Sequence, residues 1–219
     1  MSSDYRGKFI TFEGGEGVGK STQAMELRRF LESRGVDVVL TREPGGSPGA
    51  EEIRHLLVTG GTDKWCAMTE TLLHYAARAQ HLEETILPAL KRGAWVICDR
   101  YADSTLAYQG YGQGQNIDKI LEIHRLVTGD FWPDLTILLD GGVKLGLNRA
   151  RHREDLEDRQ TREDRYERMG EEFHQTLRNS FLDIARKNPD RITVVDAEGG
   201  IDLIAGHIAQ VICDRFFGK

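Results

Sequence analysis

The first feature that could do chemistry is a phosphate-binding pattern near the N-terminus. Residues 12–22 read FEGGEGVGKST, in which Gly14, Gly19, Lys20 and Ser21 match the pattern G-x-x-x-x-G-K-[ST]. A loop of this kind wraps backbone N–H groups and a lysine around phosphate groups. An apolar strand precedes the loop and a helical segment follows it, which is the context that the pattern requires. We therefore predict a P-loop.

Each residue type in this loop has a physical role. Lys20 is expected to reach the β- and γ-phosphates of a nucleotide, and the Ser21 hydroxyl to help hold Mg²⁺. Thr22 follows at a helix N-terminus, where the helix dipole also favours anions. The expected ATP-binding residues are Gly14, Gly15, Glu16, Gly17, Val18, Gly19, Lys20, Ser21 and Thr22. Glu16 is the unexpected member, because a carboxylate is an unusual group beside a polyanion.

Several classes of P-loop protein do not fit the sequence. A GTPase needs the guanine-reading motif N-K-x-D, which is absent, and D-A-E-G at residues 196–199 follows the last expected strand. A helicase or another ATPase motor is usually larger. The remaining class is the small phosphoryl-transfer kinases, which need a second pocket for an acceptor. A nucleotide-binding switch without turnover is the alternative from another class.

Two stretches offer residues for a second pocket. TREPGG, at residues 41–46, follows an expected strand, and ligands of α/β sheets bind at the carboxyl ends of strands. AARAQ, at residues 76–80, places Arg78 in a long helix one turn after His74, so that the two share a face. A buried arginine there needs an anion or a carboxylate. A structural salt bridge is therefore as good an interpretation as a ligand contact.

A third stretch, DRYADSTLAYQG, begins at the tip of another expected strand. Asp99 can orient Mg²⁺ or its water, and Arg100 can clamp a phosphate. Tyr108 and Gln109 add an aromatic ring and an amide, which we place in a loop.

The elements that position these residues alternate between strands and helices. The expected strands are residues 9–13, 36–42, 95–99, 135–140 and 192–196, and the last three are apolar runs that end in aspartate. Continuous apolar strands are typical of a parallel sheet covered on both faces. The expected helices are residues 20–33, 50–58, 69–91, 117–128, 143–153, 166–188 and 201–216. This order predicts one α/β domain over residues 1–219, with a doubly wound parallel sheet.

Composition agrees with a globular protein that binds a small ligand. The chain has 219 residues, of which 39% are hydrophobic and 29% are charged, and its net charge is -6. This charge argues against binding a nucleic acid polymer, because such domains are usually basic. The polar N-terminus, the lack of an apolar run of about 18 residues and the three widely spaced cysteines predict a cytoplasmic protein without a membrane span.

Together the motifs resemble one family closely, the thymidylate kinases. The resemblance covers FEGGEGVGKSTQ, TREPGGSPGAEEIRHLLV, AARAQH, DRYADSTLAYQGYGQG and the arginine-rich segment before the last long helix. It implies a P-loop kinase fold and transfer of the γ-phosphoryl group of ATP to dTMP, with Mg²⁺ as cofactor, for dTTP synthesis. It also implies a homodimer. The nearest rivals are a kinase for another nucleoside monophosphate and a deoxynucleoside kinase.

The resemblance implies roles for individual residues. Arg54, Arg78 and Arg100 are expected to hold the dTMP phosphate, and Thr105 and Gln109 to read the thymine edge. The Tyr108 ring is expected to crowd the 2′ position of the sugar, and Pro44 to form the pocket wall near the methyl group. Glu16 is expected to accept a hydrogen bond from the 3′-hydroxyl. His74 stands where relatives carry phenylalanine, one turn before Arg78, and can still stack on thymine.

The last expected feature is a lid at about residues 149–168. This segment has seven arginines and seven acids with almost no apolar residue, so a solvated helical hairpin is the simpler interpretation. Relatives with an arginine in the P-loop do not need a lid arginine, but Gly17 and Val18 follow the acid in this chain. The resemblance therefore implies that Arg149, Arg151 and Arg153 supply the missing cation. The segment is long, so Arg159, Arg162 or Arg165 can take the place of one of them.

Overall fold

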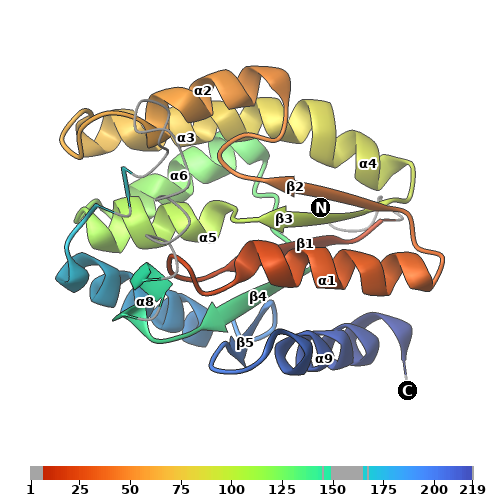
Figure 1. Ribbon diagram of the computed structural model, residues 1–219. Coiled ribbons are helices and arrows are strands. Elements are labelled where there is room, and N and C mark those ends of the chain that lie inside the picture. Colours follow the sequence, from red (N-terminus) through yellow and green to blue (C-terminus); the bar gives the residue numbers. More distant parts are fainter. Residues whose placement is uncertain (1–6, 145, 149–164, 167, 219) are drawn as a thin grey trace.

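The computed structural model describes residues 7–144, 146–148, 165–166 and 168–218, and in them the chain builds a five-stranded parallel sheet (Figure 1). The strands are β1 (Phe9–Glu13), β2 (Val38–Arg42), β3 (Trp95–Asp99), β4 (Leu135–Asp140) and β5 (Ile192–Asp196). Their spatial order is β2-β3-β1-β4-β5, and every neighbouring pair is parallel. The predicted doubly wound α/β sheet is confirmed.

Helices cover both faces of this sheet. They are α1 (Lys20–Ser33), α2 (Pro48–Val58), α3 (Ala67–His81), α4 (Leu87–Lys91), α5 (Ala102–Thr105), α6 (Ile117–Thr128), α8 (Glu171–Lys187) and α9 (Ile201–Ile212). Three π-helical segments, η1 (Leu82–Ile86), η2 (Leu106–Gly112) and η3 (Cys213–Phe217), continue α3, α5 and α9.

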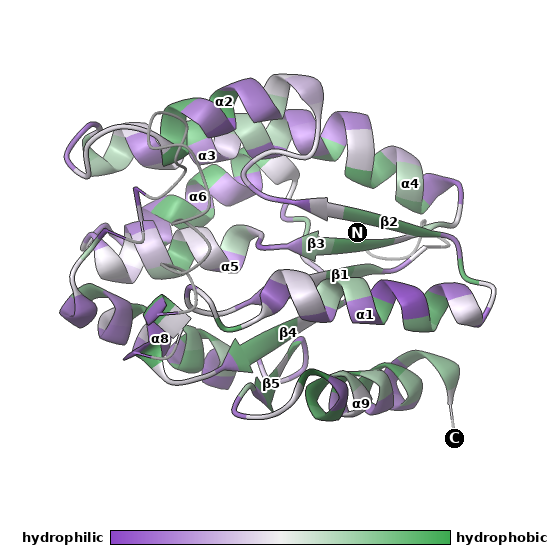
Figure 2. Ribbon diagram, viewed as in Figure 1, coloured by the Kyte–Doolittle hydropathy of each residue, from purple (hydrophilic) through white to green (hydrophobic). Residues whose placement is uncertain are grey.

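The core explains why the central strands are mostly apolar. On one face, buried side chains of α1 and α9, among them Leu27, Leu31 and Ile208, pack on strand residues such as Ile10 and Ile137. The other face is covered by two clusters of buried side chains, which include residues of α4 and α8. The strands are correspondingly hydrophobic in Figure 2. This arrangement leaves the carboxyl ends of the strands open to carry a site.

Several predicted boundaries were wrong for local reasons. The second strand begins at Val38, because the Val36 N–H donates to the Leu31 carbonyl and caps α1 instead. Helix α2 begins at Pro48, whose fixed φ suits the first helical turn. The expected helix over 69–91 is interrupted by η1, just before Pro88, which has no N–H to donate.

The helix expected over 166–188 begins only at Glu171, because Gly170 has extended backbone angles. Helix α9 ends at Ile212, and the last expected turn is π-helical instead. In the helix expected over 143–153, residues 143–144 and 146–148 are helical, and its remaining residues lie outside the described chain. In the described residues no helix is long and apolar enough to cross a membrane.

Candidate active site

The P-loop joins β1 to α1 and closes around the Lys20 ammonium. Gly14, Gly17 and Gly19 all have positive φ angles, of 137°, 65° and 100°. At Gly17 a side chain would also collide with the backbone, since its Cβ would lie 1.9 Å from the Gly146 carbonyl oxygen. Lys20 Nζ donates to the Gly15 carbonyl at 2.6 Å. Burial and the nearby Arg100 charge lower the pKa of Lys20 to about 8.

The P-loop lines a cleft of about 700 Å³ that holds both of the expected magnesium-binding residues. The Ser21 hydroxyl donates to Asp99 Oδ2 at 2.6 Å, although the two residues lie 78 positions apart in the chain. A hydroxyl and a carboxylate at the edge of a phosphate site are the oxygen ligands that suit Mg²⁺. Gly199, Ile201 and Ile204 also line this cleft.

Arg100 is held at the junction between the P-loop and β3. Its guanidinium donates to the Gly14 carbonyl at 3.0 Å, to Ser104 Oγ at 3.1 Å and to Glu16 Oε1 at 2.8 Å. Its own φ is 72°, in the left-handed region that non-glycine residues rarely adopt. The Arg100 N–H donates to the Phe12 carbonyl, which helps hold this conformation.

Glu16 of the P-loop is a charged partner of Arg100. Its Oε1 accepts hydrogen bonds from Arg100 and from the Tyr108 hydroxyl, the latter at 2.7 Å. Burial raises the pKa of Glu16, but the charges of Arg100 and Lys20 and the Tyr108 bond outweigh it and hold the pKa at about 2. The carboxylate is therefore ionised at neutral pH.

A second pocket of about 150 Å³ lies beside the cleft. It is lined by Glu16, Glu43, Pro44, Arg54, His74, Arg78, Arg100, Tyr101, Ser104, Thr105, Tyr108, Gln109 and Tyr166. Every residue that the sequence assigned to the acceptor is in this set. Arg54 and Arg100 line both the cleft and the pocket, whereas Arg78 lines the pocket alone. The structure thus separates Arg78 from the other two arginines.

The buried Arg78 guanidinium donates hydrogen bonds to two side chains. Its Nε donates to Glu43 Oε2 at 2.8 Å, and its Nη2 donates to Thr105 Oγ1 at 3.1 Å. The guanidinium also lies over the rings of Tyr75 and Tyr101. Its Nη1 is buried with no hydrogen-bond partner in the described chain. The structural salt bridge is therefore present, and the same side chain also lines the pocket.

His74 of α3 and two residues of η2 add aromatic and amide groups to the pocket. Tyr108 and Gln109 lie on the π-helical segment η2, so their expected placement in a loop was wrong. Gln109 Nε2 donates to Glu70 Oε1 at 2.7 Å. His74 Nε2 lies 3.0 Å from the Tyr166 hydroxyl. Burial and the charges of Arg78 and Arg165 lower the pKa of His74 to about 3, so its imidazole is neutral and able to stack on a base.

Sequence reasoning missed two buried carboxylates that support these arginines. Glu43, next to the assigned Pro44, pairs with Arg78, and an acid at the end of a strand was the available signal. Glu13 accepts bonds from the Tyr101 N–H at 2.7 Å and from Ser104 Oγ at 2.6 Å. Burial raises the pKa of Glu13 to about 8. Because Ser104 also accepts from Arg100, Glu13 helps to orient that guanidinium.

The expectations for the lid fall mostly outside the described residues. Arg149, Arg151, Arg153, Arg159 and Arg162 are not described. Arg165 is buried and pairs with Glu70 at 2.5 Å, and it donates to the carbonyls of Leu57, Gly61 and Thr62. With these partners Arg165 does not reach the P-loop cleft, so the structure speaks against its use as the missing cation.

The chain has a P-loop at a strand–helix junction, and the second pocket shares two arginines with the P-loop cleft. This combination defines a small phosphoryl-transfer kinase. The comparisons with known proteins identify which one. The family model for thymidylate kinase matches residues 12–208, and the chain belongs to the thymidylate kinase family.

Individual relatives resemble the chain over nearly its whole length. A thymidylate kinase of Caulobacter vibrioides is 48% identical over 210 residues, which cover 96% of this chain and 98% of the relative. One of Magnetococcus marinus is 44% identical over 97% of this chain and 98% of the relative. The crystal structure of the thymidylate kinase from Ehrlichia chaffeensis has 35% identity and a TM-score of 0.72, and the match covers 94% of this chain and 98% of that one.

Proposed function

We propose that the site performs the reaction of its family, transfer of the γ-phosphoryl group of ATP to dTMP, which gives ADP and dTDP. The observation that carries this proposal is the pair of arginines, Arg54 and Arg100, that line both the P-loop cleft and the second pocket. Two phosphate groups repel each other, so cations shared by both cavities allow the two phosphorylated substrates to meet there. A coupled assay of ADP formation with dTMP, dUMP, dCMP, dGMP and thymidine tests it, with dTMP expected far ahead.

We assign ATP to the larger cleft. Lys20 and the P-loop N–H groups hold its β- and γ-phosphates, and the adenine extends toward Gly199 and Ile201. Ser21 and Asp99 would hold Mg²⁺, which supplies charge neutralisation for the transferring group. Arg149, Arg151 and Arg153 are proposed to add a cation from the lid, in place of the arginine that the P-loop lacks.

We assign dTMP to the second pocket. Arg54 and Arg100 hold its phosphate, since they reach both cavities. Arg78 lines the pocket with Thr105 and Gln109, so we place it at the base, where its guanidinium donates to a ring carbonyl. Pro44 and His74 form the walls of the base site, and Tyr108 crowds the sugar. The attacking phosphate oxygen is largely ionised at neutral pH, so alignment and charge neutralisation carry the reaction.

The assignment of Glu16 to the 3′-hydroxyl leads to a specific expectation. Glu16→Ala is expected to lower kcat/KM for dTMP by about ten- to hundredfold, because a hydrogen bond to a charged group is lost, and Glu16→Gln by less. Wild-type enzyme is expected to prefer dTMP strongly over 2′,3′-dideoxy-TMP, and Glu16→Ala to erase most of that preference. Steady-state kinetics with both substrates measure it.

The control for this test is Tyr108→Phe, which removes the hydroxyl bonded to Glu16 Oε1 but keeps the carboxylate. This variant is expected to retain the preference for dTMP over the dideoxy analogue. Undiminished discrimination by Glu16→Ala would show that Glu16 does not read the 3′-hydroxyl.

We also propose a homodimer in the cytoplasm. The free Cys66, Cys98 and Cys213 thiols agree with a reducing compartment. Helix α3 packs against both α2 and α6. The three helices carry the exposed apolar side chains Leu56, Met68, Leu72 and Leu126, with exposed fractions of 42%, 39%, 51% and 85%. Such a patch on neighbouring helices suits an isologous interface between two copies.

A charge in this patch is expected to separate the copies. Leu72→Glu should shift the mass measured by light scattering after gel filtration from that of two chains to that of one, because a buried unpaired carboxylate is costly. Val194→Glu is the matched control, since Val194 is 46% exposed on β5, away from these helices. A wild-type enzyme that runs as a monomer, or an unchanged mass for Leu72→Glu, would contradict the proposed interface.

A further inference from the structure

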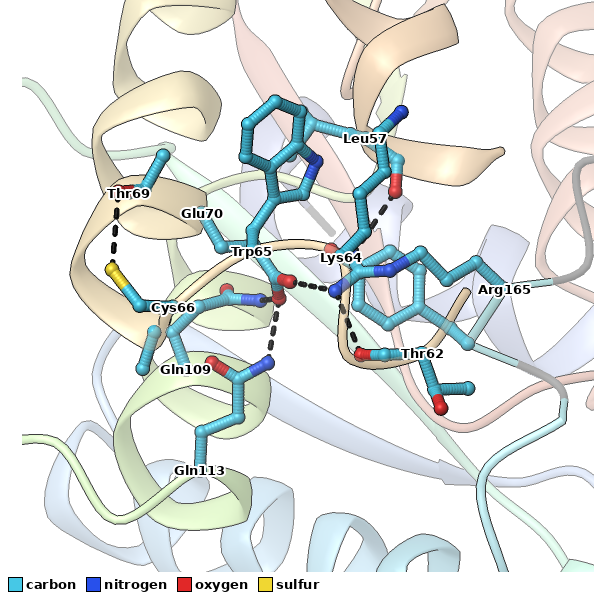
Figure 3. A network of polar contacts seen from close by, with 12 residues as sticks. Leu57, Thr62, Lys64, Trp65, Cys66, Thr69, Glu70, Gln109, Gln113 and Arg165 are labelled. Atoms are coloured by element: carbon cyan, nitrogen blue, oxygen red, sulfur yellow. Dashed lines mark hydrogen bonds and ion pairs between the residues drawn. The ribbon is translucent and has the colours of Figure 1, made fainter. Parts of the chain in front are cut away.

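The base end of the second pocket is supported from behind by a buried carboxylate that is not part of its lining. Glu70 lies in the first turn of α3 and is fully buried. Its Oε1 accepts from Gln109 Nε2 and from Gln113 Nε2, each at 2.7 Å (Figure 3). Gln109 lines the pocket, whereas Glu70 and Gln113 do not. Glu70 therefore contacts the proposed base-reading residue without reaching the base.

Arg165 keeps this carboxylate in its place. Its Nη2 pairs with Glu70 Oε2 at 2.5 Å, so the two carboxylate oxygens have different partners (Figure 3). The guanidinium is fixed in turn by the carbonyls of Leu57, Gly61 and Thr62, at 3.1, 2.9 and 3.0 Å. A carboxylate paired with a buried arginine accepts hydrogen bonds but cannot donate them.

We propose that Glu70 determines base specificity by fixing which end of the Gln109 amide faces the pocket. The amide nitrogen must donate to Glu70, so the carbonyl Oε1 is the group that Gln109 presents to a ligand. No donor in the described chain bonds to that oxygen. The inference rests on the proposed placement of the base beside Gln109, and it concerns a positioning residue that acts through this amide.

The resulting pocket presents one donor and one acceptor. The donor is the Arg78 guanidinium, which lines the pocket and cannot accept a hydrogen bond, and the acceptor is Gln109 Oε1. A thymine edge offers a carbonyl beside a ring N–H and satisfies both. A cytosine edge offers an amino group beside a bare ring nitrogen, so it would meet a donor with a donor and an acceptor with an acceptor. Unpaired buried polar groups give strong discrimination.

The test is Glu70→Gln, which keeps the shape of the side chain but replaces one acceptor oxygen with an NH₂ donor. The new amide is expected to turn its oxygen to the charged Arg165 and its NH₂ group to Gln109, which must then flip and present its own NH₂ to the pocket. We expect the ratio of kcat/KM for dTMP over dCMP to fall about ten- to hundredfold. The ratio for dTMP over dUMP should not change, because those two bases share the same edge and differ only by a methyl group.

Three further variants separate this role from a structural one. Glu70→Asp keeps an acceptor-only group and should retain the dTMP over dCMP ratio. Gln113→Ala removes the other bond to the same oxygen without touching the pocket and should also retain it. Gln109→Met removes the amide and should lose the discrimination. If Gln109→Met keeps it, the proposed base site is wrong. If Gln109→Met loses it and a folded Glu70→Gln keeps it, only the role of Glu70 is wrong.

A crystal structure of the wild-type enzyme with dTMP tests the same inference should Glu70→Gln not fold. It is expected to show Gln109 between Glu70 and the base, with its Oε1 within hydrogen-bond distance of the ring N–H. A base whose ring nitrogen contacts another residue would overturn the proposal.

Discussion

Replacement of Lys20 by alanine is expected to lower the rate of phosphoryl transfer by about 10³-fold or more. The side chain is buried in the P-loop cleft and donates to the loop's own carbonyls, so its ammonium already lies where phosphate oxygens would bind. Its charge is of most value in the transition state, when negative charge on the transferring group is least compensated. The loss should therefore appear mainly in kcat.

The stability of Lys20→Ala is not expected to fall with its rate. The pKa of Lys20 is lowered to about 8, first by burial and then by Arg100, so folding disfavours its charged form. Removing the ammonium relieves that cost, and the variant should melt at the wild-type temperature or above it. Lys119→Ala, an exposed lysine on α6, is the control and should leave kcat unchanged. A folded Lys20→Ala enzyme with near-normal turnover would refute the P-loop assignment.

The sequence predicted the sheet well because its strands carry their own signals. Residues 95–99, 135–140 and 192–196 are apolar runs that end in aspartate, and β3, β4 and β5 have these same limits. Helix ends were harder to predict because local hydrogen bonds set them. The capping bond from Val36 to Leu31 shortened the second strand, and a π-helical turn before Pro88 divided a continuous helical pattern.

The residues of the site could be predicted from motifs, but their buried partners could not. Motifs predicted residues that would share a site, and the structure brings Ser21 to Asp99 and Arg78 to Thr105. Motifs could not show which groups pair with the buried glutamates. Glu43, Glu13 and Glu70 have their partners at sequence separations of 35, 88 and 39 residues, and such pairings follow only from the fold.

Arg100 lines both the P-loop cleft and the second pocket. Arg100→Met is expected to lower kcat by about 10³-fold, because an arginine that bridges donor and acceptor phosphates stabilises the charge of the transferring group. Arg125→Met, an exposed arginine on α6, is the control. Wild-type kcat in a folded Arg100→Met enzyme would remove Arg100 from the transfer step.

The same variant should acquire a dependence on acid pH that wild-type enzyme lacks. Burial alone raises the pKa of Glu16, and Arg100 is the main charge that holds it down at about 2. Without Arg100 the pKa of Glu16 must rise, so the carboxylate takes up a proton as the pH falls, and it can then no longer accept as a carboxylate. The residual kcat/KM of Arg100→Met should therefore fall on the acid side, at pH values where the wild-type profile is flat.

Because the titrating group is Glu16, the double variant Arg100→Met with Glu16→Gln should lose this acid limb. An acid limb that survives in the double variant would assign the proton to another group, and the buried Glu13, which also senses the Arg100 charge, would be the next to test.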